Sequence, residues 1–149
     1  LRIDKLTLAA MESTLRLYLN PPAARGKIPA LRLLTAPAAE IRRRAKRLQG
    51  RMARELSAVC TGSLKEESSQ VGGGALPLQA LPTWVVAVRP LPISAAQMDE
   101  RLRRNDPPII GRVKDDEVLL DLRTVLPDEE KTLLEGVRQA LNRKDGERS

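Results

Sequence analysis

The chain has 149 residues and a formal net charge of +7, which permits an anionic partner such as nucleic acid. It has no histidine and one cysteine, Cys60, which excludes a Ser-His-Asp triad, a histidine or cysteine-rich metal site and an internal disulfide. No run approaches the roughly 18 apolar residues of a membrane span and no signal peptide opens the chain, so we expect a cytoplasmic protein without membrane contact.

The first predicted element is a helix over Lys5–Leu19, with Asp4 as its N-cap. Asn20-Pro21-Pro22 ends it, and a loop is predicted to follow as far as Lys27. Residues 1–27 are therefore interpreted as an interdomain helix and its linker. Because the helix is apolar on more than one side, we expect it to associate with a partner. The residues expected in that contact are Leu8, Met11 and Leu15.

A strand is predicted over Ile28–Leu34, where apolar and basic residues alternate and Pro29 suits a strand start. A long helix then runs from about Pro37 to Ala58, with apolar residues at every third or fourth position. It also carries a cluster of basic residues, among them Arg43 and Arg47, that would meet nucleic-acid phosphates. The alternative is an ordinary solvated face, which the absence of neighbouring aromatic residues in the sequence favours.

A short edge strand is predicted within Gly62–Gln70 and a further strand over Thr83–Arg89. Between them lie Gly72, Gly73 and Gly74, the least ordinary local sequence of the chain. This triplet is either a backbone nest for an anion or a flexible connector between strands. No GKS or GxGxxG pattern surrounds it, so a nucleotide-binding P-loop is excluded.

Ser94 and Gln97 form a capping box for a helix that reaches Arg104. The segment Pro107–Val125 then predicts a β-hairpin, since two apolar runs flank the polar turn Lys114-Asp115-Asp116. Within its first strand, Arg112 has two interpretations. It either pairs with Asp121 across the hairpin or binds an anionic group of a substrate.

A last helix is predicted from Pro127 to about Leu141. Strands that follow one another along the chain favour antiparallel pairing, with the helices massed on one face of the sheet. The predicted fold class is therefore α+β, and residues 28–149 are interpreted as one small domain preceded by a long linking helix.

Four stretches together resemble bacterial selenocysteine synthase, the L-seryl-tRNA(Sec) selenium transferase family. In chain order they are LRIDKLTLAAMESTLRLYL, IPALRLLT, SQVGGGALP and PPIIGRVKDDEVLLDLRTV. The resemblance runs from Leu1 to about Leu134. It implies the C-terminal small domain of a fold-type-I pyridoxal-phosphate (PLP) enzyme, with the cofactor-binding large domain and the N-terminal tRNA domain absent.

The resemblance also implies an activity, partners and site residues. The family makes selenocysteinyl-tRNA(Sec) from seryl-tRNA(Sec) and selenophosphate, and it forms a ring of dimers. Its PLP lysine would lie upstream of Leu1, so we expect this fragment to hold no cofactor and to be inactive. The family runs an Arg-x-x-Arg pair into the Asp-Lys-Leu-Thr segment, and Arg2 matches the second arginine, a candidate for binding selenophosphate.

Two alternatives stay open beside this interpretation. One is a basic RNA-binding or assembly module without catalysis, and the other is a paralogous PLP-dependent lyase.

Overall fold

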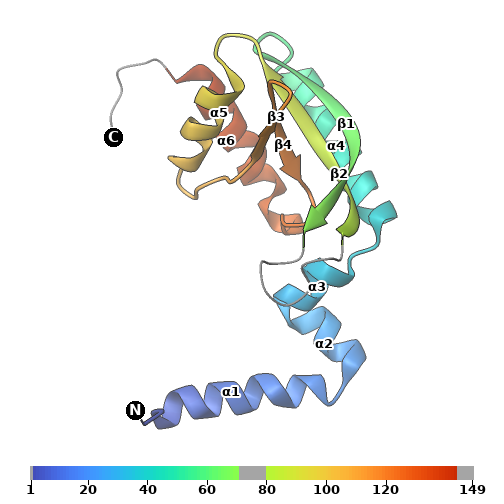
Figure 1. Cartoon of the computed structure of the whole chain (residues 1–149), viewed down its shortest axis with the longest axis vertical. Coiled ribbons are helices and arrows are strands. Elements are labelled where there is room, and N and C mark those ends of the chain that lie inside the picture. The colour runs from blue at the N-terminus through green and yellow to red at the C-terminus, as the bar shows by residue number, and fades with distance from the viewer. Residues whose placement is uncertain (1, 71–79, 144–149) are drawn as a thin grey trace. The chain divides into compact units, whose positions relative to one another are not determined.

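The computed structural model describes residues 2–70 and 80–143, and the chain divides into two compact units (Figure 1). The first unit is Leu1–Ala36 and the second is Pro37–Ser149.

The first unit contains three helices: α1 (Lys5–Tyr18), α2 (Pro21–Lys27) and α3 (Pro29–Thr35). The predicted cap of α1 is confirmed, because Asp4 accepts hydrogen bonds from the amides of Leu6 and Thr7, each at 2.9 Å. The Thr7 hydroxyl also donates to Asp4, and this bond is the largest of the influences that lower the pKa of the Asp4 carboxyl. No residue of α1 is buried within the structure.

Two predictions in this unit are wrong. The expected loop up to Lys27 is the helix α2, and the expected strand Ile28–Leu34 is the helix α3. Asn20 caps α2 through the amide of Ala23, and Pro29 occupies the first turn of α3, where proline is as well suited as at a strand start. The compact units meet after Ala36, while the predicted domain boundary at residue 27 stays a prediction.

The second unit is built on a four-stranded antiparallel sheet with the order β1-β2-β4-β3. The strands are β1 (Cys60–Gln70), β2 (Ala80–Pro90), β3 (Arg112–Lys114) and β4 (Glu117–Asp121). The predicted short edge strand is thus an eleven-residue strand, β1, paired along its whole length with β2.

The predicted hairpin is confirmed as β3–β4, with Lys114 opposite Glu117. The two turn residues, Asp115 and Asp116, have φ of 53° and 59°, the left-handed conformation that a two-residue hairpin turn requires. Its first strand is shorter than expected, because the amide of Ile109 bonds to the carbonyl of Leu102 at 2.9 Å instead of joining the sheet.

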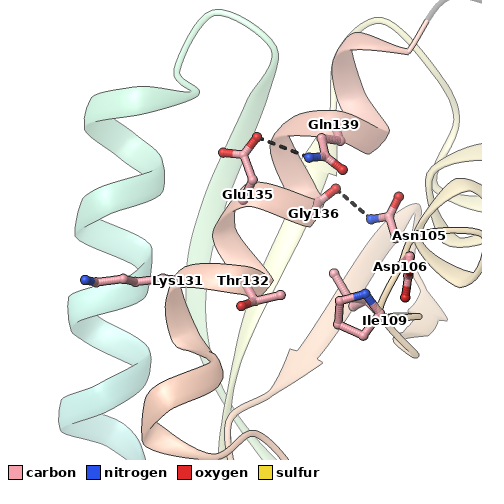
Figure 2. A pocket seen from close by; sticks show the side chains of 9 residues that line it. Asn105, Asp106, Ile109, Lys131, Thr132, Glu135, Gly136 and Gln139 are labelled. Atoms are coloured by element: carbon pink, nitrogen blue, oxygen red, sulfur yellow. Dashed lines mark hydrogen bonds between the residues drawn. The ribbon is translucent and has the colours of Figure 1, made fainter.

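Three helices of this unit lie on one face of the sheet: α4 (Ala38–Glu55), α5 (Ala95–Arg103) and α6 (Glu130–Asn142). A 3₁₀ turn, Pro127–Glu129, precedes α6. Figure 2 views this side, with α4 and α6 in front of the strands. The predicted capping box of Ser94 and Gln97 is present at the start of α5. The α+β class and the antiparallel sheet are therefore as predicted.

The main core lies between this helix layer and the sheet. Val86 and Val88 of β2 pair with Leu120 and Val118 of β4, which places these four buried side chains on one face. The predicted apolar stripe of α4 packs there, as do the inward residues of α6. These residues are Ile41, Ala45, Leu48 and Met52 from α4, and Leu133, Leu134, Val137 and Leu141 from α6.

Candidate functional site

The opposite face of the sheet carries charged and hydroxyl side chains over a small apolar patch. We call it the charged face. Val85, Ala87 and Leu119 form the patch and are at most 3% exposed. The register places the polar residues beside them: Lys65, Glu67, Ser69, Thr83, Arg89, Arg112, Lys114, Glu117 and Asp121.

Ion pairs connect the outer strands across this face. Glu117 pairs with Lys65 and, at 3.5 Å, with Arg89, while Lys114 Nζ lies 2.9 Å from Glu67 Oε1. The hydrogen bond from Lys65 lowers the pKa of the Glu117 carboxyl below its usual value. The bond between Lys114 and Glu67 likewise lowers the pKa of Glu67 and raises that of Lys114. Both carboxylates are thus held in the charged form.

Asp121 joins three strands at one end of the charged face. It accepts hydrogen bonds from the hydroxyls of Ser69 and Thr83, the latter at 2.7 Å, and from the amide of Arg123 at 3.0 Å. Arg112 Nη2 lies 4.0 Å from the same carboxylate. The carboxylate therefore fixes the end of β1 and the exit of β4 at the same time.

The predicted pairing of Arg112 with Asp121 is present. Arg112 also donates to the carbonyl of Ser68 at 3.3 Å, and its side chain remains 47% exposed. A guanidinium that is held in place and still about half exposed retains donors that can bind an anion.

Three buried arginines, Arg44, Arg101 and Arg123, were not expected from the sequence. Arg101 donates to the carbonyl of Ala140 at 3.1 Å and to the carbonyl of Arg143 at 2.6 Å. Arg123 is 6% exposed and donates to the carbonyl of Pro82 at 2.7 Å. Burial lowers the pKa of its guanidinium, while Asp121 opposes that change. Arg44, although basic like its neighbours in α4, lies inside the apolar stripe of this helix. The signal was its position, three residues after Ile41 and four before Leu48, both buried.

The other basic residues of α4 reach the surface, as expected for one side of an amphipathic helix. Arg43 and Arg47 are exposed, and Arg47 lies 3.9 Å from Glu130, which Arg44 binds at 2.6 Å. The guanidinium of Arg42 stacks on the ring of Trp84, 4.6 Å from its centroid. An aromatic residue therefore accompanies the basic cluster, although no aromatic residue neighbours the cluster in the sequence.

The remaining predicted site residues lie elsewhere. Arg2 is exposed and extended just before the Asp4 cap, in the first unit, whereas Arg112 belongs to the second. Gly72, Gly73 and Gly74 lie outside the described residues.

A cleft of about 300 Å³ lies between α6 and the segment that leads from α5 to β3 (Figure 2). Asn105 donates to the carbonyl of Gly136 at 3.0 Å, and Gln139 donates to Glu135 at 3.3 Å. A Cβ on Gly136 would stand 2.2 Å from the Ile109 side chain, so this glycine permits close packing. Lys131 points away from the cleft. The polar lining thus bonds mostly to itself.

Residues 2–70 and 80–143 were also compared with the requirements of a metal site and of a membrane-spanning helix. These residues contain no cluster of His, Cys, Asp or Glu that could hold a metal ion. None of their helices is long and apolar enough to cross a membrane. Cys60 is buried, as expected for a packing residue, and burial raises the pKa of its thiol.

Comparison with known proteins decides the family. Residues 1–126 match the family described as L-seryl-tRNA selenium transferase. The chain belongs to this family. The match covers the unit Leu1–Ala36 and continues through the hairpin, so the family relationship includes α1 and the charged face together.

Individual selenium transferases agree with this assignment. The chain is 47% identical over 144 residues to the L-seryl-tRNA(Sec) selenium transferase of Desulfovibrio desulfuricans, covering 95% of this chain and 30% of that protein. It is 45% identical over 141 residues to the one from Moorella thermoacetica, with the same coverages. Over 133 residues it is 49% identical to the enzyme of Geotalea uraniireducens, covering 89% of this chain and 29% of that protein. The chain spans about a third of the length of these relatives.

Proposed function

We propose that this chain is the C-terminal part of a PLP-dependent enzyme that converts seryl-tRNA(Sec) to selenocysteinyl-tRNA(Sec) with selenophosphate. The observation that carries the proposal is the 47% identity to a selenium transferase over 95% of the chain. The antiparallel sheet covered by helices on one face supports placing the chain as the small domain of a fold-type-I enzyme.

None of the lysines that the structure describes suits the role of the lysine that holds PLP. Such a lysine must be able to lose its proton in a shielded site. Lys65 and Lys114 are committed to ion pairs with glutamates, and Lys144 lies outside the described residues. The other four are exposed: Lys5, Lys27, Lys46 and Lys131. We therefore propose that the cofactor is bound by a part of the full-length enzyme beyond this chain, and that this chain alone is inactive.

Arg2 is proposed to bind selenophosphate in the full-length enzyme. Selenophosphate is a compact polyanion, and a guanidinium offers both charge and two parallel donors to its oxygens. Arg2 lies two residues before Asp4, next to the N-terminus of α1, where the helix dipole is positive.

The test replaces Arg2 in the full-length enzyme that carries this segment. Arg2→Ala should reduce selenium transfer by about a hundredfold or more, and Arg2→Lys should restore little of it, because lysine lacks the planar fork. PLP absorbance and seryl-tRNA binding should stay near normal in both. Arg16→Ala, which removes an exposed arginine of α1 paired only with Glu12, is the matched control. Near wild-type transfer by Arg2→Ala would refute the assignment.

The charged face is proposed to border the substrate site. Arg112 supports this, because its side chain is 47% exposed while Asp121 and the Ser68 carbonyl hold it in place. Gly72, Gly73 and Gly74 remain a candidate anion nest on the basis of their sequence alone. Cytoplasmic location and assembly of the full-length enzyme into a ring of dimers complete the proposal, both drawn from the family resemblance.

A further inference from the structure

The outer side of α4 presents a line of basic side chains opposite its buried stripe. Arg43, Lys46, Arg47 and Arg54 follow one another at helical spacing, and Gly50 leaves a gap in the middle. At 1.5 Å per residue the line from Arg43 to Arg54 is about 16 Å long.

Most of this charge is not neutralised by the protein. Among the described residues, Arg43, Lys46 and Arg54 are exposed and form no ion pair. Arg47 lies 3.9 Å from Glu130, which Arg44 already binds at 2.6 Å. Arg47 therefore retains much of its capacity to bind an external anion. Three unpaired cations on one side of a helix repel one another, and an external polyanion would relieve this repulsion.

An aromatic residue lies beside Arg42, which precedes this line in the helix. Trp84 of β2 is half-buried, and Arg42 covers one side of its ring at 4.6 Å. Arginine and tryptophan are side chains on which unpaired nucleic-acid bases stack, and guanidinium groups match phosphate geometry. An acidic protein surface would use the charges but not the indole.

We propose that the exposed basic side chains of α4, Arg43, Lys46 and Arg54 together with Arg42 on Trp84, bind the phosphate backbone of RNA without reading its sequence. That the RNA is a tRNA rests on the proposed function. Arg47 contributes less than Arg43, because Glu130 holds it in part.

The test measures binding of a labelled tRNA transcript to the whole 149-residue chain by fluorescence anisotropy across a salt series. Replacing Arg43, Lys46 and Arg54 together by alanine should weaken binding about tenfold or more at 0.1 M salt. It should also reduce the slope of log K against log salt by about 2 to 3, roughly one for each lost phosphate contact. The charge-matched control replaces Lys5, Arg25 and Lys27 of the first unit, all exposed, by alanine.

Equal weakening by both triple variants would overturn the proposal, since only net charge would then matter. Competition by poly-glutamate at the same charge concentration as tRNA would also overturn it, in favour of an acidic protein partner. Trp84 is the only tryptophan, so its fluorescence gives a readout that needs no variant. It should change on addition of tRNA, and an unchanged signal under saturating tRNA would refute the proposal even where the triple variant fails to fold.

Failure of the proposed RNA binding by α4 can be distinguished from failure of the proposed function. Arg2→Ala should leave tRNA binding by this chain intact while reducing selenium transfer in the full-length enzyme. The α4 triple variant should weaken the binding of tRNA by this chain.

Discussion

Neighbouring arginines of α4 have opposite roles. Arg44 donates to Glu130 at 2.6 Å, to the carbonyl of Leu122 at 3.2 Å and to the carbonyl of Val125 at 2.7 Å. These bonds link α4 to the segment between β4 and α6, and they satisfy acceptors that would otherwise be buried without a donor. Arg43, the next residue back, points to solvent.

Arg44→Ala should therefore destabilise the second unit by about 2–4 kcal/mol, because the buried carbonyl of Leu122, the partly buried carbonyl of Val125 and a glutamate lose their donor. Arg43→Ala, on the same helix, should change the free energy of unfolding by less than about 0.5 kcal/mol. Urea denaturation followed by Trp84 fluorescence measures both. Similar values for the two variants would show that the buried network adds no stability.

The ion pairs of Glu117 predict how stability depends on pH. Because the folded-state pKa of Glu117 is lowered from 4.5, the folded protein binds this proton less tightly than the unfolded chain. The contribution is complete above about pH 4.5 and is lost as the pH falls through the folded-state value. Glu117→Gln should thus show a smaller drop in Tm between pH 5.5 and pH 3.5 than the wild type. Thr124→Ala, at an exposed site, serves as the control and should keep the wild-type dependence.

Residues whose roles depend on nearby sequence were predictable. The caps at Asp4 and Ser94 act on amides within three residues, so their patterns are visible in the sequence. Arg44 and Arg123 bond to residues about 80 and 40 positions away, and no local pattern carries that information.

At the scale of elements, the turn of β3–β4 does not contain the residues that stabilise its conformation best. Asp115 and Asp116 both adopt positive φ, which costs a non-glycine residue about 1 kcal/mol. The preferred residues for such a turn are Asn followed by Gly.

Asp116→Gly should therefore stabilise the protein by about 0.5–1 kcal/mol, although glycine also gains freedom in the unfolded chain. Asp116→Val should destabilise it, because a β-branched residue tolerates this conformation poorly. Thermal unfolding at constant pH compares the two. An increase in Tm with valine would mean that the turn is not held in this conformation in solution.

Helices of the second unit were predictable because their apolar periodicity extends over several turns. The errors at α2 and α3 concern segments of seven residues each, too short to show a helical period. Proline at the first position fits a loop as well as a helix in α2, and a strand as well as a helix in α3. The length of β1 was missed because its outer residues are polar and join the charged face, where pairing with partners on other strands replaces apolar burial.

At the scale of the molecule, the two units differ in how much they bury. Ala24 is the only buried apolar residue among the described part of Leu1–Ala36, whereas the apolar core of the second unit begins at Ile41. We therefore expect the second unit to provide nearly all of the measurable stability.

A chain that begins at Pro37 should keep the wild-type midpoint of urea denaturation, with a difference in free energy below about 1 kcal/mol. Trp84 reports on this transition in both proteins. A loss of several kcal/mol would show that helices α1 to α3 support the sheet.

The position of β2 in the sheet has a consequence for folding kinetics. The β1–β2 ladder begins with Gln70 opposite Ala80, 10 positions apart, and the β3–β4 hairpin begins with Lys114 opposite Glu117, 3 positions apart. The β2–β4 pair that is nearest in sequence, Val88 and Val118, is 30 positions apart. Closing that longer loop costs more chain entropy and is expected to limit the rate. Truncating Val88 or Val118 should therefore slow refolding, while a substitution that weakens only the far end of β1 should mainly accelerate unfolding.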